Sequence, residues 1–226
     1  MSCAAAILLV GGMLLCGACG KPDLPAESAD SAGFNSLFAS NCSGCHGAGG
    51  RNGAAQSLSD PLYLSIVTED EIRRTVEYGR PGTSMPAFAQ NQGGPLSPAQ
   101  IETIVNGIEH SWRGSASLNG TTPPGTTPLG TTPPPYSAPL GNAQNGNVIF
   151  DAVCCLCHGE KGAVGPVTGA SYLTLVSDQG LRTTIIVGRP ALGMPDWRHQ
   201  PYHHGLTDQD ISDLVAWLSS QRPRAL

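Results

Sequence analysis

The sequence is poor in aromatic and charged residues, which make up 5 % and 13 % of its 226 positions. Side chains of this kind are too few for a large aromatic core, so we expect something besides side chains to fill the interior. The formal net charge is −5, and no cluster of lysine or arginine occurs along the chain. Because nucleic-acid binding depends on a basic surface, the composition argues against nucleic acid as a partner.

The sequence also lacks a long apolar run. Residues 4–19 are apolar but short for a membrane span, and they suit the central region of an export signal. The run ends in Leu15-Cys16-Gly17-Ala18-Cys19, which resembles the cleavage site of a bacterial lipoprotein. We therefore interpret residues 1–19 as a signal, with lipidation of Cys19 as the leading hypothesis and simple cleavage or a retained short anchor as alternatives. The chain is then exported to the periplasm or the outer face of the membrane.

Glycine and proline, at 29 and 19 residues, are unevenly distributed. Residues 20–33 are small and polar, which is typical of a tether. Residues 113–143 are dominated by Thr, Pro, Gly and Ser with a repeated Gly-Thr-Thr-Pro unit, and this composition predicts a disordered linker. Two compact segments remain, 34–112 and 144–226.

The two compact segments read as copies of one another. Each has a phenylalanine four residues before a Cys-x-x-Cys-His motif, then Gly-Arg-Pro, then Met-Pro, then a helix start with apolar residues at helical spacing. Ser97 and Thr207 are the expected N-caps, and Pro98 suits a first helical position. The sequence predicts an all-α protein of two small domains.

A Cys-x-x-Cys-His motif attaches c-type haem, because its two thiols can form thioethers with the porphyrin vinyl groups while the histidine binds iron. The first motif supplies Cys42, Cys45 and His46, and the second supplies Cys154, Cys157 and His158. A redox-active thiol pair or half of a zinc site is the alternative. The histidine in both copies, the lack of a second Cys-x-x-Cys within either segment and the export signal all favour haem. Cys155 lies inside the second motif but outside the required spacing.

The sixth position on each iron needs a ligand, and methionine is the expected partner of histidine in cytochromes c. Met85 and Met194 occupy the same slot in the two repeats, each followed by proline. An arbitrary methionine is more often core filler, but two matched ones in Gly/Pro-rich loops favour axial ligands. Competing ligands would be His199, His203 and His204, which we interpret as exposed loop histidines.

With these motifs, each segment resembles a small class I cytochrome c domain. The resemblance implies a haem wrapped by helices, with the first helix, carrying Phe38 or Phe150, crossing the last near Trp112 or Trp217. It also implies that a proline carbonyl after the motif accepts the proximal histidine proton. Pro166 is placed to do so for His158, whereas no proline is available to His46.

Arg80 and Arg189 each precede the proline of the methionine loop. Either they pair with a haem propionate or they are solvated surface residues, and the sequence leaves both open.

The resemblance as a whole is to diheme c-type cytochromes, with two covalently bound haem c groups and no catalytic residues. Such a protein passes single electrons between membrane or periplasmic redox partners of a respiratory or photosynthetic chain, as a free shuttle or as a fixed subunit of a complex. With both irons six-coordinate, no position is open for a small-molecule substrate. A diheme enzyme of the peroxidase or thiosulfate-oxidising type is the alternative.

Overall fold

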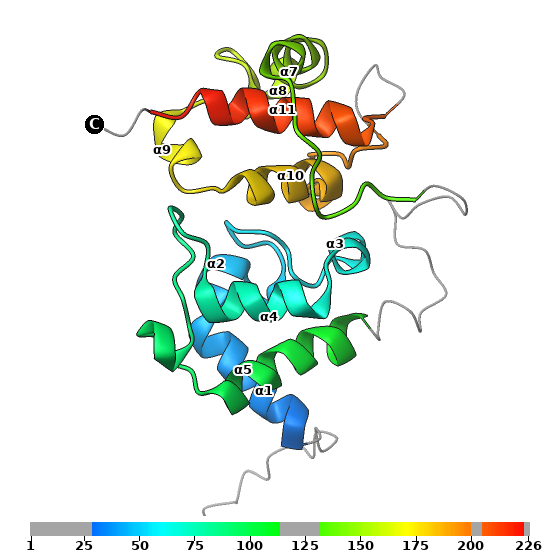
Figure 1. Ribbon diagram of the computed structural model, residues 1–226. Helices are drawn as coiled ribbons and strands as arrows, with labels where there is room; N and C mark the ends of the chain where they lie inside the picture. Colours follow the sequence, from blue (N-terminus) through cyan, green and yellow to red (C-terminus); the bar gives the residue numbers. More distant parts are fainter. Residues whose placement is uncertain (1–28, 114–131, 200–204, 224–226) are drawn as a thin grey trace, which may run out of the picture.

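The computed structural model describes residues 29–113, 132–199 and 205–223, which form helices joined by loops (Figure 1). Within these ranges the only β-type pairings are two isolated bridges, so the prediction of an all-α fold is confirmed. None of the helices in these ranges is long and apolar enough to span a membrane. The signal, Cys19 and most of the predicted linker lie outside the described residues.

The first domain, described over residues 29–113, begins with a helix that runs into the first haem motif. Its elements are α1 (Ala29–Asn41), α2 (Ser43–His46), η1 (Ala48–Gly50), α3 (Pro61–Ile66), α4 (Glu69–Tyr78), η2 (Gln90–Gln92), α5 (Pro98–Asn106) and η3 (Gly107–Arg113). The last of these continues α5 with π-helical hydrogen bonding.

The second domain follows the same order. Its elements are α7 (Ala143–Ile149), η4 (Phe150–Cys154), α8 (Cys155–His158), α9 (Ala170–Leu173), α10 (Asp178–Val187), η5 (Pro190–Leu192) and α11 (Asp208–Ser220). Here η4 is π-helical and joins α7 to α8, so a single run of helix leads to the second motif.

The closing helices begin where the sequence predicts. Ser97 caps α5 and Thr207 caps α11, and both form capping boxes, with Gln100 and Asp210 respectively. Pro98 is the first residue of α5, a position where its missing N–H costs no hydrogen bond. The chain therefore enters both closing helices through the same local chemistry.

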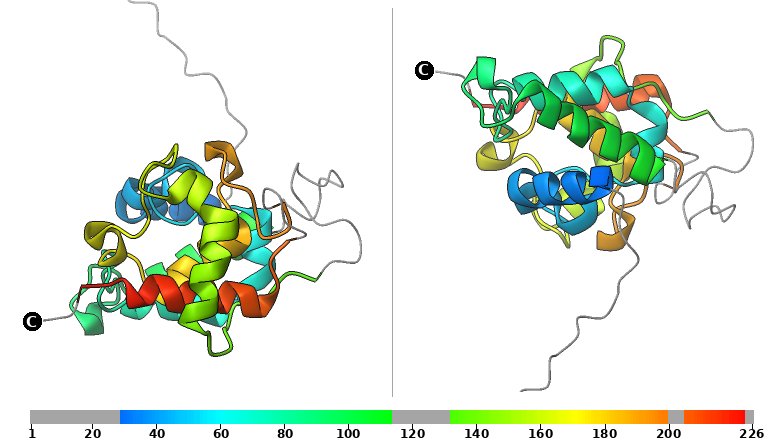
Figure 2. Two further views of the ribbon diagram at one scale, coloured as in Figure 1. Left: turned by 90° about the horizontal axis from the view of Figure 1, so that it is seen from above. Right: turned by 90° about the horizontal axis from the view of Figure 1, so that it is seen from below.

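In each domain the first helix packs across the closing helix, and Figure 2 shows α7 crossing α11. Each crossing pairs one large aromatic residue with one glycine, and the helix that carries the aromatic residue differs between the two domains. Phe34, four residues before Phe38, is 1 % exposed and lies on Gly107, where an added Cβ would come within 2.1 Å of its ring. In the second domain, the corresponding positions hold Gly146 and Trp217. A Cβ on Gly146 would lie 2.0 Å from the Asp213 carbonyl oxygen and 2.8 Å from the Trp217 Cβ.

The expected crossing of the first and last helices near Trp112 and Trp217 is confirmed. The two tryptophans are not equivalent positions of the repeat, because Gly107 follows Ile101 at the distance at which Trp217 follows Ile211. Trp112 lies further along, on η3, and packs edge-on against Phe34 and Phe38 with ring centroids 5.1 and 5.0 Å apart. Trp217 contacts Phe150 at 4.3 Å.

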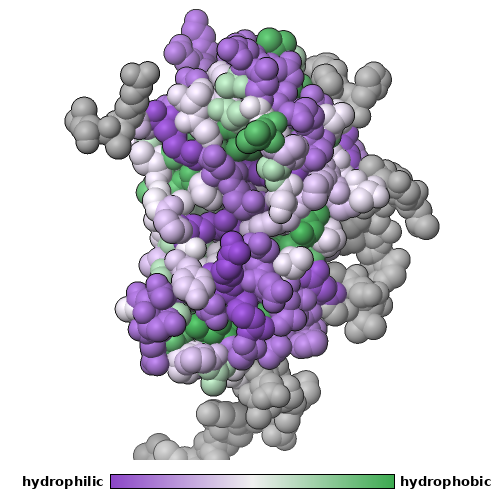
Figure 3. Space-filling view, viewed as in Figure 1, coloured by the Kyte–Doolittle hydropathy of each residue, from purple (hydrophilic) through white to green (hydrophobic). Residues whose placement is uncertain are grey.

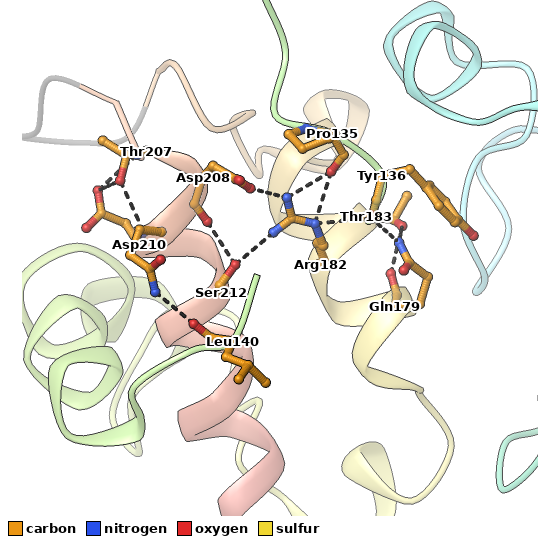
Figure 4. A network of polar contacts seen from close by, with 11 residues as sticks. Pro135, Tyr136, Leu140, Gln179, Arg182, Thr183, Thr207, Asp208, Asp210 and Ser212 are labelled. Atoms are coloured by element: carbon orange, nitrogen blue, oxygen red, sulfur yellow. Dashed lines mark hydrogen bonds and ion pairs between the residues drawn. The ribbon is translucent and has the colours of Figure 1, made fainter. Parts of the chain in front are cut away.

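The end of the predicted linker is packed rather than free. Residues 132–142, here called the strap, lie against the second domain, and Tyr136 is only 9 % exposed. Arg182 of α10, itself 1 % exposed, donates to the Pro135 and Tyr136 carbonyls (Figure 4). The prediction of disorder over 113–143 was therefore wrong for these residues, since a buried guanidinium binds their backbone and the Tyr136 side chain joins the apolar core.

The two domains lie against one another, with α3 close to α10. Buried apolar side chains of both domains and Tyr136 of the strap belong to one continuous cluster. On the face shown in Figure 3, hydrophilic residues cover most of both domains and apolar residues form small patches.

Candidate haem-binding sites

The first motif lies on a short turn of helix directly after α1. Cys42 precedes α2, and Cys45 and His46 close it. Burial, with the neighbouring Cys45 as a lesser cause, raises the pKa of the Cys42 thiol to about 11, so it is protonated at neutral pH. Both cysteines are free thiols. The two cysteines and the histidine thus lie on one turn, and both thiols are free.

His46 is oriented by a backbone carbonyl. Its Nδ1 lies 2.7 Å from the Gln56 oxygen, and because a carbonyl only accepts, Nδ1 carries the proton and Nε2 keeps a free lone pair. Burial lowers the pKa of His46; the Gln56 carbonyl raises it and the Arg80 charge lowers it further, for a net decrease that favours the neutral imidazole. This is the state in which histidine binds iron.

The role of Gln56 was not predicted, because any residue can offer a carbonyl. The loop that delivers it returns to the motif through an Ala55 N–H donated to the Cys45 carbonyl at 2.9 Å. Gly47, at φ 79°, and Gly53 permit that return, since a Cβ on Gly53 would lie 2.2 Å from the Cys45 oxygen. These glycines were the only signal of the loop in the sequence.

The second motif has the same local form but a different surrounding for its histidine. Cys154 ends η4, and Cys157 and His158 lie on α8. Burial, followed by the charges of the neighbouring cysteines, raises the pKa of Cys154 to about 12. Cys155 is exposed and donates its thiol to the Asp151 carbonyl at 2.9 Å, away from the motif, as its position outside the spacing predicts.

The hydrogen bond expected from His158 to Pro166 is absent. His158 Nδ1 is buried and has no hydrogen-bond partner among the described residues, while Pro166 is exposed. The loop after this motif turns at Gly165, φ 88°, and its link to the motif is the Val164 N–H donated to the Cys157 carbonyl at 3.0 Å. The two proximal histidines therefore differ in the opposite sense from that predicted.

Both methionine loops are closed at their base by the arginine of the Gly-Arg-Pro sequence. The Arg80 N–H donates to the Met85 carbonyl at 3.0 Å, and Arg189 and Met194 exchange two hydrogen bonds, of 2.9 and 3.2 Å. Both methionines are half-buried. The two loops thus hold the candidate axial ligands with the same arginine-to-methionine backbone hydrogen bond.

The glycine before each arginine is needed for this closure. Gly79 and Gly188 have φ of 65° and 68° and end α4 and α10. An added Cβ would lie 2.5 Å from the Pro86 carbonyl carbon in one loop and 2.6 Å from that of Pro195 in the other. A side chain at either position would push the Met-Pro backbone off the helix end.

The arginine side chains bind protein groups. Arg80 donates to the Tyr136 hydroxyl, and Arg189 donates to the Gly53 and Ala54 carbonyls. Neither contact was predicted, because both join parts of the chain that sequence alone does not place side by side.

The histidine alternatives find little support. The His199 side chain is 57 % exposed, and its Nδ1 lies 2.9 Å from the Asp196 carboxylate, whereas His203 and His204 lie outside the described residues. No group of three or more His, Cys, Asp or Glu side chains in the described ranges could hold a metal ion by itself.

Both segments that carry these motifs match a known protein family. Residues 29–106 and 141–218 each match the family described as cytochrome C oxidase, cbb3-type, subunit III. The chain belongs to this family. It is a c-type cytochrome made of two cytochrome c domains, as the internal repeat predicts, and covalently bound haem c is the cofactor that the family implies.

Three similar proteins show how much of the chain and of each relative is matched. The cbb3-type cytochrome c oxidase subunit CcoP of Azospirillum sp. (strain B510) is 27 % identical over 83 % of this chain and 60 % of its own length. Subunit FixP of Azorhizobium caulinodans is 34 % identical over 61 % of this chain and 41 % of its own. Cytochrome c-L of Methylorubrum extorquens is 30 % identical over 61 % and 69 %. The chain thus spans 60 % or less of the two oxidase subunits that it resembles.

The residues present fit haem c at both sites of this cytochrome. Each site offers two free thiols and a histidine on one helical turn. At the first, the histidine is fixed with Nε2 as its only free nitrogen. These are the groups that would bind haem covalently and ligate its iron.

Proposed function

We propose that this chain is an electron carrier with two haem c groups, one in each domain. Cys42 and Cys45 hold the first haem and Cys154 and Cys157 the second. The iron ligands are His46 and Met85 in the first domain and His158 and Met194 in the second. The observation that carries the proposal is the proximal turn at His46, where the Gln56 carbonyl leaves Nε2 as the one nitrogen able to bind iron.

Because both irons would be six-coordinate, neither has a position open for a substrate, and the chemistry that remains is electron transfer. His/Met ligation gives haem iron a reduction potential at which respiratory electron carriers can both reduce and oxidise it. We propose that the chain serves a respiratory chain that ends in a cbb3-type oxidase, because two of the three relatives named above are subunits of such an oxidase. It works outside the cytoplasm, held at the membrane by a lipid on Cys19 or by its N-terminal segment.

The second domain is the better candidate for meeting a protein partner. Its loops carry exposed Leu156 between the motif cysteines, Val164 after the motif and Leu192 before the methionine, at 63, 68 and 64 % exposure. The first domain has Gly44, Asn52 and Thr83 at these positions. Exposed apolar groups around a cofactor favour docking of another protein.

Electron delivery to an oxidase tests the proposal. The purified, reduced holoprotein, mixed with membranes that contain a cbb3-type oxidase, should be reoxidised by oxygen, and an inhibitor of the oxidase should stop this. If hydrogen peroxide or thiosulfate is instead turned over by the chain alone, the protein is a haem enzyme and the proposal is wrong.

A further inference from the structure

The arginines of the two Gly-Arg-Pro sequences stand at equivalent positions, and each bonds to a part of the chain beyond its own domain. Arg189 donates from Nη1 to the Ala54 carbonyl at 3.2 Å and from Nη2 to the Gly53 carbonyl. Arg80 donates from Nη2 to the Tyr136 hydroxyl at 2.5 Å. Each methionine loop is therefore fastened, at its base, across the boundary between the domains.

Tyr136 is a fixed point of the second domain. Its carbonyl accepts from Gln179 at 2.9 Å and from Arg182 at 3.2 Å, both on α10 (Figure 4). Arg182 in turn pairs with Asp208 and donates to Ser212 on α11 at 3.2 Å. Because the strap is held by two helices, the hydroxyl that meets Arg80 moves with the second domain.

The carbonyls that Arg189 binds belong to the loop that orients the first proximal histidine. Gly53 and Ala54 lie between the His46 motif and Gln56, whose carbonyl fixes His46 Nδ1 at 2.7 Å. Arg189 itself closes the Met194 loop through its backbone. A single side chain thus links the distal loop of the second domain to the proximal loop of the first.

We propose that Arg80 and Arg189 are positioning residues that hold the two domains in one arrangement, so that electrons pass between the haems at a fixed separation. The proposal rests on the proposed function, since it concerns the two haems assigned there. Arginine suits the second of these positions because the planar fork of Arg189 donates to two carbonyls at once, which a lysine ammonium cannot match in geometry.

The test uses the holoprotein with a protease site inserted among residues 114–131. The variants are Arg80→Ala, Arg189→Ala, the double variant and Tyr136→Phe, and the control is Arg73→Ala, whose ion pairs with Glu69 and Glu102 stay inside the first domain. After cleavage, gel filtration measures whether the halves remain together. Electron exchange between the haems is followed, before cleavage, after rapid one-electron reduction.

For the parent protein and the Arg73→Ala control, the cleaved halves should co-elute and interhaem exchange should be first-order and independent of protein concentration. Loss of each hydrogen bond from a charged donor weakens an interface about tenfold or more. The double variant loses three such bonds, one from Arg80 and two from Arg189, so we expect the cleaved halves to separate and interhaem exchange in the uncleaved protein to slow at least tenfold.

Unchanged co-elution and exchange in the double variant would overturn the proposal. So would a shift in the midpoint potential of the haem in the arginine's own domain with exchange unaffected, because the arginine would then serve a propionate. A parent protein without two covalent haems would instead refute the proposed function, which the pyridine spectrum of the same sample reports.

Discussion

Replacing Gly146 with alanine tests how closely α7 and α11 must approach in the second domain. The new Cβ would lie 2.0 Å from the Asp213 carbonyl oxygen and 2.5 Å from its carbon. These are backbone atoms of α11, so relief requires the helices to separate. Overpacking of this kind costs about 1–3 kcal/mol, and the gain of up to about 1 kcal/mol from a helical Gly→Ala change offsets only part of it.

We expect a net loss of about 1 kcal/mol, which corresponds to a fall in melting temperature of roughly 4–8 °C for a domain of this size. Thermal unfolding of the holoprotein, followed by far-ultraviolet circular dichroism, measures it. Gly33→Ala in α1 is the matched control, because its Cβ would meet only the Thr103 methyl at 3.7 Å. That variant should be as stable as the parent protein or more so.

Gly107→Ala in the first domain creates a clash with a side chain, whereas Gly146→Ala creates one with the backbone, so the two variants should respond differently to a second substitution. A Cβ on Gly107 would meet the Phe34 ring at 2.1 Å, so Gly107→Ala should be rescued in part by Phe34→Leu. Trp217→Leu should not rescue Gly146→Ala, since the Asp213 carbonyl remains in place. A Gly146→Ala protein that melts with the parent would refute the packing account.

Three further predictions concern the second domain. Burial raises the pKa of the Asp213 carboxyl, but hydrogen bonds from Asn145, Asn142 and Gln209 lower it by more. The stabilisation from this carboxylate should therefore be present above its unfolded-state pKa of about 3.9 and be lost as pH falls through its lower folded-state pKa. Acid titration of the free energy of unfolding should show this loss in the parent and not in Asp213→Asn. Met194→Leu should open one iron to carbon monoxide, whereas His199→Ala should leave the spectrum unchanged, and the reverse pattern would make His199 the ligand. Leu156→Ser with Val164→Ser should slow oxidation by the partner at low concentration, whereas Asn52→Ser should not, and equal rates would move the docking surface elsewhere.

The elements that sequence predicted well are those set by local chemistry. The capping residues Ser97 and Thr207 and the all-α fold depend on neighbours within a few residues, and the duplication made each pattern visible twice. The family match confirms the two cytochrome c domains. Local signals of this kind survive without knowledge of the tertiary structure.

The features that sequence did not predict depend on long-range placement. The Gln56 carbonyl that orients His46 has no side-chain signature, and the partners of Arg80 and Arg189 lie beyond their own domain. The strap was assigned to disorder because its composition is apolar-poor, whereas a buried Arg182 binds its backbone. The exchange of a large and a small residue between Phe34/Gly107 and Gly146/Trp217 was also not predicted, because it depends on how closely the helices approach at each crossing.

The central claim is that each chain binds two haem c groups through Cys42, Cys45, Cys154 and Cys157. The most direct measurement is the haem-to-protein ratio from the alkaline pyridine spectrum, together with mass spectrometry of peptides that carry the two motifs. We expect two haems per chain that acid acetone does not extract, with one thioether-linked haem on each motif peptide. A ratio of one, an extractable haem or a motif peptide with free thiols in the mature protein would contradict it.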